Sequence, residues 1–183
     1  MKRVITNPIF DDEVRFVQTA EESGGEVTEL EIRLQPGGGN ELHFHETYEE
    51  VFTAVEGALG VRLGKNGEEQ VLAPGESITV KRGQVHAFFN PGDEEILFKV
   101  ELKPGHTGFE HSLRIMYGLA HDGMVNDQGM PTNPKHLGVI AHLSEMGSPK
   151  LLLRLTQPIL LWVGRRAAKD GTLEDLRQRY IEA

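Results

Sequence analysis

Residues 37–50 read Gly37-Gly38-Gly39-Asn40-Glu41-Leu42-His43-Phe44-His45-Glu46-Thr47-Tyr48-Glu49-Glu50. Because successive side chains of a β-strand point to opposite faces, we expect His43 and His45 to project to the same side. Two imidazoles at this spacing can form one edge of the coordination sphere of a metal ion. Glu50, past a turn, can add a carboxylate from the neighbouring strand, and His86 can close the site from across a barrel.

Two histidines at this spacing are by themselves more often a surface pair than a pair of metal ligands. The interpretation as ligands depends on their combination with a nearby carboxylate and with the distant His86. Glu49 and Glu50 compete for the role of that carboxylate. Glu50 is favoured, because Glu50, Phe52 and Ala54 share the face of the following strand that should point inward.

These residues resemble the two motifs of the cupin superfamily, G-x5-H-x-H-x3,4-E-x6-G and G-x5-P-x-G-x2-H-x3-N. The first motif is matched by Gly37, His43, His45, Glu50 and Gly57, and the second by Gly75, Gly83, His86 and Asn90. Lys81 stands where the family usually has proline, so we expect a less rigid turn before His86. The resemblance covers about residues 25–105.

The resemblance implies a mainly β fold, a double-stranded β-helix barrel of the jelly-roll type, which we expect to occupy residues 1–105. In cupins, the residues that match His43, His45, Glu50 and His86 bind one divalent metal ion inside the barrel. Three imidazoles and one carboxylate suit iron, manganese, nickel or zinc. Cupins commonly pair their barrels, so a homodimer is the expected assembly.

The sequence before Pro104 alternates apolar and polar residues in short segments between glycine-rich turns, as is typical of a barrel or sandwich. The side chains expected to point inward are nearly all apolar: Leu30, Ile32, Leu34, Phe52, Ala54, Leu59, Val61, Leu63, Ile78, Val80, Phe88, Phe98 and Val100. Arginine and lysine fall on the outward face, which favours a small, weakly charged substrate.

Four of the residues around this interior are candidates for contact with a substrate: Phe52, Phe88, Phe98 and Glu41. Glu41 shares the face of His43 and could lie at the mouth of the barrel, although such a residue is more often a solvated strand end. Tyr48, Glu49 and Gln84 are further candidates for proton transfer. Nothing in the sequence distinguishes one of them from the others.

Residues 106–183 are predicted to form a helical extension. Thr107 opens a capping box before a first helix, which stops near Gly123. Asn133-Pro134 starts a second amphipathic stretch that ends at Gly147. The first helix carries two of the five histidines that lie outside the motifs, and it could fold over the barrel mouth. These five histidines are His106, His111, His121, His136 and His142.

Ser148-Pro149 starts a third helix, in which Pro158 should produce a kink, and Thr172 opens a short last helix. The apolar run of residues 151–163 is followed by Arg165, Arg166 and Lys169. One interpretation is an amphipathic helix that meets a membrane or a partner. We favour burial against the barrel or a second subunit, because the chain as a whole is acidic.

The composition excludes several classes of site and partner. The 183 residues include no cysteine, which removes disulfides, thiolate metal sites and cysteine nucleophiles. The formal net charge of −9 argues against a nucleic-acid partner. The N-terminus lacks the apolar core of a signal peptide, and no apolar run is long enough for a membrane span, so a cytoplasmic location is expected.

The sequence favours a metal-dependent cupin enzyme that acts on a small organic molecule, foremost a dioxygenase or another oxidoreductase. An isomerase or lyase of the same fold is an alternative, and so is a non-catalytic cupin that holds a metal and a small ligand. A sensor with a nucleic-acid-binding arm is disfavoured, because the extension is not basic overall. The fold does not choose among the others, because it hosts many activities.

Overall fold

The computed structural model describes residues 2–182, except for the side chains of residues 152–154. Eleven strands and four helices follow one another through these residues. The strands are β1 (Val4–Asn7), β2 (Asp12–Gln18), β3 (Thr28–Leu34), β4 (Phe44–His45), β5 (Glu49–Glu56), β6 (Leu59–Leu63), β7 (Glu68–Leu72), β8 (Ser77–Val80), β9 (His86–Phe89), β10 (Ile96–Lys103) and β11 (Met146–Gly147). The helices are α1 (Thr107–His121), α2 (Pro134–Ser144), α3 (Leu151–Ala167) and α4 (Thr172–Tyr180).

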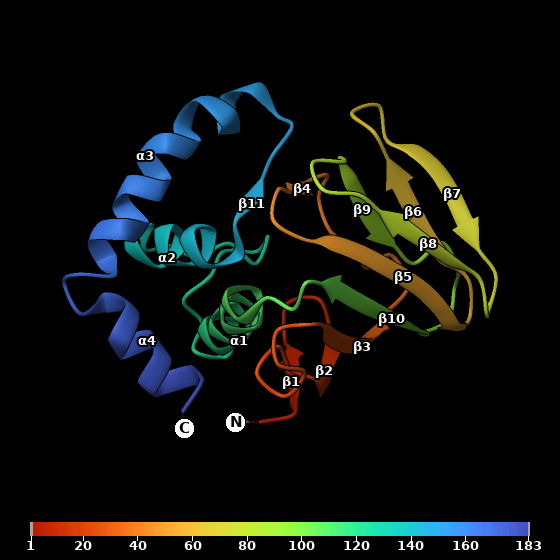
Figure 1. The fold of residues 1–183 in the computed structure, drawn as a ribbon, viewed down its shortest axis with the longest axis horizontal. Coiled ribbons are helices and arrows are strands. Elements are labelled where there is room, and N and C mark those ends of the chain that lie inside the picture. The colour runs from red at the N-terminus through yellow and green to blue at the C-terminus, as the bar shows by residue number, and fades with distance from the viewer. Residues whose placement is uncertain (1, 183) are drawn as a thin grey trace.

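The strands pair into three antiparallel sheets. A six-stranded sheet has the order β1-β2-β3-β10-β5-β8, a three-stranded sheet has the order β7-β6-β9, and β11 pairs with β4. Across the described residues these sheets are separate and do not join into one closed barrel. The chain is therefore mainly β with a C-terminal helical part, as expected, whereas barrel closure is not observed (Figure 1).

The apolar face of each long strand forms one core between the sheets. β10 lies centrally, with Phe98 opposite Ile32 of β3 and Val100 opposite Phe52 of β5. All thirteen side chains expected to point inward lie in this core or pack against it. The alternation of apolar and polar residues therefore predicted the buried face of these strands correctly.

The first two strands were not predicted. β1 and β2 pair antiparallel at the edge of the larger sheet, and Val14 and Phe16 of β2 are buried in the core. Their apolar residues are few and the strands are short, so the alternation in the sequence gives a weak signal. Their position is fixed by pairing with β3, a contact between distant parts of the chain.

Helix α1 lies between the sheets and the other helices in Figure 1. Its buried Glu110 accepts hydrogen bonds from the Ala20 amide (2.7 Å) and the Thr28 hydroxyl (2.5 Å), which anchors the helix to the larger sheet. Ile115 and Leu119 of α1 face a second apolar core shared with α2 and α4. The helical part is thus attached to the strands mainly through α1.

Several helix boundaries differ from the predicted ones. His106, not Thr107, is the N-cap of α1, because its Nδ1 atom accepts the Phe109 amide at 2.8 Å. Helix α2 has the predicted cap at Asn133 but ends at Ser144, three residues before the predicted end, because Glu145 adopts a left-handed conformation. Residues 146–147 then form β11.

Helix α3 begins two residues later than Ser148-Pro149 predicts. Lys150 occupies the N-cap position and makes no capping hydrogen bond through its side chain. Pro158 lies inside α3, and the helix continues through it to Ala167. Part of the apolar run predicted here, the side chains of residues 152–154, lies outside the described set.

Candidate metal centre

Four side chains converge between the two larger sheets. The ligand atoms of His43, His45, Glu50 and His86 all lie within 4.8 Å of one another, and all four residues are buried. The most exposed of them, His43, retains only 7% of its accessible surface. The sequence-predicted ligand set is therefore brought together in one place.

Backbone pairing places the three imidazoles. His43 and His86 form a β-bridge, in which each amide donates to the other residue's carbonyl at 2.9 and 2.8 Å. Their rings lie 4.3 Å apart between centroids, and the His43 ring lies 4.8 Å from that of His45. The bridge explains how two histidines so far apart in sequence meet.

The turn before His86 keeps its shape without the proline that the cupin motif usually has. The Gln84 amide donates to the Lys81 carbonyl at 3.0 Å, and the Gln84 side chain accepts the Lys81 amide at the same distance. Gly83 has a φ of 73°, which glycine adopts readily and other residues do not. Its amide donates to the carbonyl of His45 at 2.7 Å, which ties the turn to the other histidines.

The carboxylate comes from the opposite sheet. Glu50 lies on β5, and one of its oxygens, Oε2, is 2.6 Å from His86 Nε2 and 3.4 Å from His45 Nε2. The neighbouring Glu49 points the other way and pairs with Lys81 Nζ at 3.1 Å. The structure thus places Glu50, the carboxylate favoured from the strand pattern, among the imidazoles.

Each imidazole is held at its Nδ1 atom by a group outside the cluster. His43 Nδ1 lies 2.8 Å from the Glu41 carbonyl, and His86 Nδ1 lies 3.0 Å from the Gln84 carbonyl. Since a carbonyl only accepts, these Nδ1 atoms carry hydrogen and the neutral rings present an Nε2 lone pair to the cluster.

The third imidazole is held by a tyrosine. The buried Tyr48 hydroxyl lies 2.5 Å from His45 Nδ1, and the two rings stack with centroids 4.3 Å apart. The sequence offered Tyr48 only as an undistinguished proton-transfer candidate. Its place beside His45 depends on the turn between β4 and β5, for which the sequence gives no clear signal.

Burial and charge set the protonation of the cluster. Burial, together with the neighbouring His86 and His45, lowers the pKa of His43 to about 3. Burial alone would raise the pKa of Glu50, but the favourable interactions of its carboxylate with His45 and His86 outweigh burial and hold that pKa below its usual range. A neutral imidazole beside an ionised carboxylate is the state in which both can ligate a metal.

Two observations fit a divalent cation. His45 Nε2 is buried and faces the cluster without a hydrogen-bond partner. His86 Nε2 and Glu50 Oε2 both present lone pairs when the ring is neutral and the carboxylate is ionised, yet they lie only 2.6 Å apart, an arrangement that a bound cation would stabilise. Three imidazole nitrogens and one carboxylate are a donor set that iron, manganese, nickel and zinc accept.

The candidate substrate contacts divide into two groups. Phe52, Phe88 and Phe98 pack together with ring centroids 5.0 to 6.5 Å apart, and the Phe52 ring lies 5.8 Å from that of His86. The Glu41 side chain, by contrast, is 81% exposed and pairs with Lys150 Nζ at 2.6 Å. It therefore points away from the cluster, and only its backbone carbonyl takes part.

The start of α1 covers one side of the cluster. The Phe109 ring lies 6.3 Å from that of His45, and the His106 ring lies 4.9 Å from that of Tyr48. His111 and His121, which the sequence placed on this helix, do not reach the cluster; the His121 ring nitrogen contacts the Thr6 carbonyl at 2.9 Å. The first turn of the helix therefore lies beside the cluster, and whether the helix covers the mouth of a barrel stays a prediction.

Sequence comparison agrees with the motif and the cluster. The family model described as a cupin domain matches residues 30–102, which include all four cluster residues. The chain contains a cupin domain. The cluster occupies this cupin domain, and α1 to α4 lie beyond its matched range.

Two curated relatives match about half of the chain. The protein named Epoxidase atD from Aspergillus terreus is 32% identical over 98 residues, which are 50% of this chain and 30% of the relative. The protein named Probable oxidoreductase patJ from Aspergillus clavatus is 33% identical over 94 residues, which are 48% of this chain and 28% of the relative. The chain spans less than a third of the length of these relatives.

Solved structures also resemble this cupin domain. The polyketide cyclase RemF from Streptomyces resistomycificus is 26% identical, with a TM-score of 0.45 over 50% of this chain and 64% of that one. An RmlC-like cupin from Shewanella frigidimarina is 19% identical, with a TM-score of 0.48 over 57% of this chain and 86% of that one.

None of the described helices combines the length and apolar character needed to cross a bilayer.

Proposed function

We propose that this chain is a metal-dependent cupin oxidoreductase that acts on a small organic molecule. In this proposal, His43, His45, Glu50 and His86 hold one divalent metal ion. The observation that carries it is the convergence of three buried imidazoles and one carboxylate, with every Nδ1 atom held from outside the cluster. Outer hydrogen bonds of this kind orient metal-ligating histidines in proteins.

The names of the curated relatives support oxidative chemistry. One is named an epoxidase and the other a probable oxidoreductase, and each matches about half of this chain. Dioxygenase activity is the specific form that we propose. The resemblance covers less than a third of either relative, so the activity is proposed for this chain on its own cluster.

The surroundings of the cluster indicate the class of substrate. Phe52, Phe88 and Phe98 provide aromatic surface on the apolar side of His86. No arginine or lysine is a hydrogen-bond or ion-pair partner of the four cluster residues among the described side chains. A small, weakly charged substrate therefore suits this site better than an organic acid or a sugar phosphate, which usually meets a cation.

A bound divalent metal would supply Lewis-acid or redox chemistry at the cluster. Two properties of the chain's own residues favour metal binding, the orientation of the imidazoles and their protonation. The carbonyls of Glu41 and Gln84 and the Tyr48 hydroxyl fix the orientation of the imidazoles. Because imidazoles ligate a metal only in their deprotonated form, affinity for the metal should rise with pH.

The fold is part of the proposal. We infer that the six-stranded and three-stranded sheets are the two faces of a double-stranded β-helix, with the metal between them. The proposed boundary lies between residues 1–105 and 106–183, since β10 ends at Lys103 and α1 begins at Thr107.

A binding role without catalysis is the second candidate, because the cluster is strongly buried. None of its four residues is more than 7% exposed, and the two surface hollows described in the structure are lined by other residues. A cupin that holds a ligand and a metal without turnover would have a metal site buried in this way. Isomerase or lyase chemistry would need the same access as oxidation.

Oxygen consumption separates these functions. The wild type, loaded with iron, is screened against small phenolic and diketone-like compounds, beside metal-free protein, Glu50→Gln and Glu49→Gln. We expect uptake only with metal, lost in Glu50→Gln and retained in Glu49→Gln, whose carboxylate faces Lys81. Uptake that is independent of the metal would contradict the proposal. Stabilisation by a compound without any turnover would favour the binding role instead.

A further inference from the structure

Helix α3 carries a row of exposed apolar side chains. Leu151, Leu155, Ile159 and Trp162 are 70%, 68%, 65% and 58% exposed. Their spacing of four, four and three residues places them along one face of the helix. Exposed leucines are common singly, but a contiguous apolar row on one helix usually marks an interface.

The opposite face of α3 is already occupied. Gly164 of α3 packs against Gly138 of α2 so closely that a side chain at either position would meet the other's backbone. Val163 also contacts this position, and Gln157 donates to the Met146 carbonyl at 3.3 Å. The inner face therefore belongs to the fold, and the apolar row lies on the exposed face of the helix. Helix α3 itself lies at the outer edge of the helical part (Figure 1).

Charge is unevenly distributed along this helix. Residues 148–169 contain five lysines and arginines and no acidic residue, although the chain carries −9 overall, so the remainder carries −14. Arg165, Arg166 and Lys169, at the end of the row, take part in no ion pair among those described. This end of α3 is a free cationic surface.

The other end of α3 lies beside acidic side chains. Glu41 contacts Lys150 at the N-cap of α3, and it is 81% exposed. Glu145, directly before β11, is 46% exposed, and Glu46 is also exposed. The apolar row thus runs from an end where the exposed carboxylate of Glu41 pairs with Lys150 to an end whose cations have no ion-pair partner among those described.

We propose that this row is the docking surface for a second copy of the same chain, with the two α3 helices antiparallel about a twofold axis near Gln157. Leu155 then lies opposite Ile159 of the second copy, and Leu151 lies near its Trp162. The antiparallel arrangement brings the cationic end of each helix to the acidic end of the other. A twofold interface needs such a self-complementary surface.

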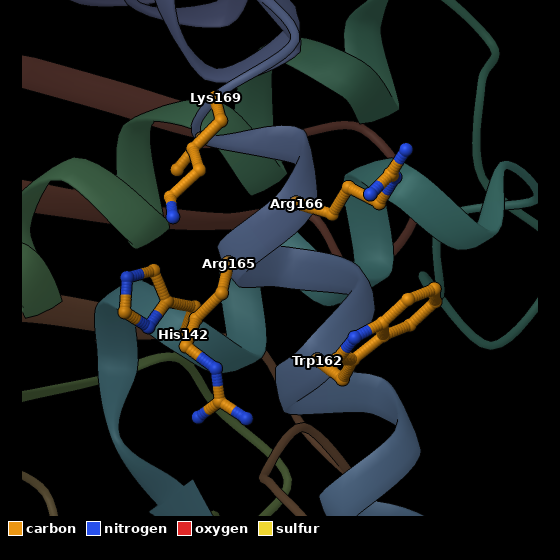
Figure 2. Close-up of a pocket in the computed structure, with 6 residues that line it drawn as sticks. His142, Trp162, Arg165, Arg166 and Lys169 are labelled. Atoms are coloured by element: carbon orange, nitrogen blue, oxygen red, sulfur yellow. The ribbon is translucent and has the colours of Figure 1, made fainter.

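A surface hollow at the cationic end fits this arrangement. It has a volume of about 430 Å³ and is lined by His142, Trp162, Arg165, Arg166, Ala168 and Lys169. Figure 2 shows Trp162 and Arg166 on one side of α3, and His142 and Arg165 on the other. In the dimer, Leu151 of the second copy approaches this hollow beside the indole ring.

An anionic lipid surface is the competing occupant, since it also accepts an apolar helix face with adjacent cations. The charge of −14 on the remainder of the chain opposes approach to such a surface. A second copy differs from such a surface because it offers a carboxylate, Glu41, beside an apolar row of its own. The test includes lipid binding as an outcome.

The first test measures the oligomeric state of the full chain by light scattering through a dilution series. We expect a wild-type dimer and a monomer for the double variant Leu155→Glu with Ile159→Glu. The matched control is Val71→Glu, which places a carboxylate at an apolar side chain that is 55% exposed on β7. The control should remain dimeric, and unchanged circular dichroism should show that all three proteins are folded.

The second test uses the absence of cysteine in the natural chain. Mixing Leu155→Cys protein with Ile159→Cys protein under oxidising conditions should give a disulfide-linked dimer of one chain of each kind, with little homodimer of Val71→Cys. A monomeric wild type would overturn the proposal, and so would a dimer that the Leu155 and Ile159 changes leave intact. A monomer that binds vesicles of anionic phospholipid would assign the row to a membrane surface instead.

Discussion

The three cluster histidines are oriented by two kinds of group. Backbone carbonyls hold His43 and His86, whereas a side chain, Tyr48, holds His45. Only the tyrosine can be removed by substitution, so it offers a direct test of what these outer hydrogen bonds contribute.

Replacement of Tyr48 by phenylalanine should weaken metal binding without abolishing it. The ring that stacks on His45 remains, but the 2.5 Å contact from the hydroxyl to His45 Nδ1 is lost. Loss of such an outer partner typically reduces metal affinity by about 10–100-fold. Competition with a chelator of known affinity measures the change at constant pH.

Tyr117→Phe is the matched control for this substitution. Tyr117 is also buried and also loses one hydrogen bond, from its hydroxyl to Asp12 Oδ2 at 2.6 Å, but it lies outside the cluster. Equal losses of affinity in the two variants would mean that Tyr48 acts only through general stability.

His43 should make the metal-free protein less stable in acid. Its pKa is about 3 in the folded chain, against an ordinary value of 6.5, because it is buried beside two other imidazoles. Between these values the unfolded chain binds more protons, so the free energy of unfolding falls as pH falls from about 6.5 towards 3. In the metal-free state, His43→Gln should therefore show a smaller loss of stability over this range.

Chemical denaturation of the chelator-treated proteins at several pH values measures this difference. The comparison of wild type with variant cancels the titration of groups far from the cluster. Parallel stability curves for the two proteins from pH 6.5 down to 4 would contradict the low pKa of His43.

The sequence predicts strands that have several alternating apolar and polar residues, and it does not predict strands that are too short to show this alternation. The strands that carry Leu30, Phe52 and Phe98 could be predicted because alternation over several residues fixes which face is buried. The pairing of β11 with β4 could not, because two residues, Met146 and Gly147, carry no periodicity. That pairing depends on where α2 ends, which a left-handed Glu145 determines.

The residues of the candidate site could likewise be predicted only in part. The four proposed ligands could be named because the family motif fixes their spacing, and the structure brings them together. The role of Tyr48 and the exposure of Glu41 depend on side-chain direction in a turn and at a strand start. Strand alternation does not apply there, so Tyr48 remained one of several proton-transfer candidates, and Glu41 was named as a possible substrate contact although a solvated strand end was favoured.

The contact between α2 and α3 depends on two glycines. An alanine at Gly164 would place its Cβ against the carbonyl of Gly138, which is backbone and cannot turn aside. Gly164→Ala should therefore lower the free energy of unfolding by about 1–3 kcal/mol, the usual cost of overpacking. Thermal or denaturant unfolding measures it.

Gly92→Ala is the control for this change, because its added Cβ would meet nothing closer than Asn90 Oδ1 at 3.5 Å. Its stability should stay near that of the wild type. If Gly164→Ala were as stable as Gly92→Ala, the close approach of α2 and α3 would be contradicted.

At the scale of the whole molecule, the cluster joins residues from three different sheets. His86 belongs to the three-stranded sheet, Glu50 to the six-stranded sheet, and His45 to the strand that pairs with β11. A metal ion bound to all of them would cross-link the two sheets and the segment that leads into α3.

Metal should therefore raise the melting temperature of the wild type. A ligand that binds only the folded state adds about 2.7 kcal/mol of stability at a hundred times its dissociation constant. Differential scanning calorimetry with and without added divalent metal measures the shift. His86→Ala should show none, and an equal shift in that variant would place the metal elsewhere.

The most direct test of the central claim is the metal content of untagged protein by elemental mass spectrometry, after reloading with iron, manganese, nickel or zinc and removal of excess metal. We predict close to one metal ion per chain in the wild type and in Glu49→Gln, and almost none in His86→Ala. A wild type that retains no metal, or a His86→Ala variant that retains it fully, would contradict the assignment of His43, His45, Glu50 and His86 as a metal centre.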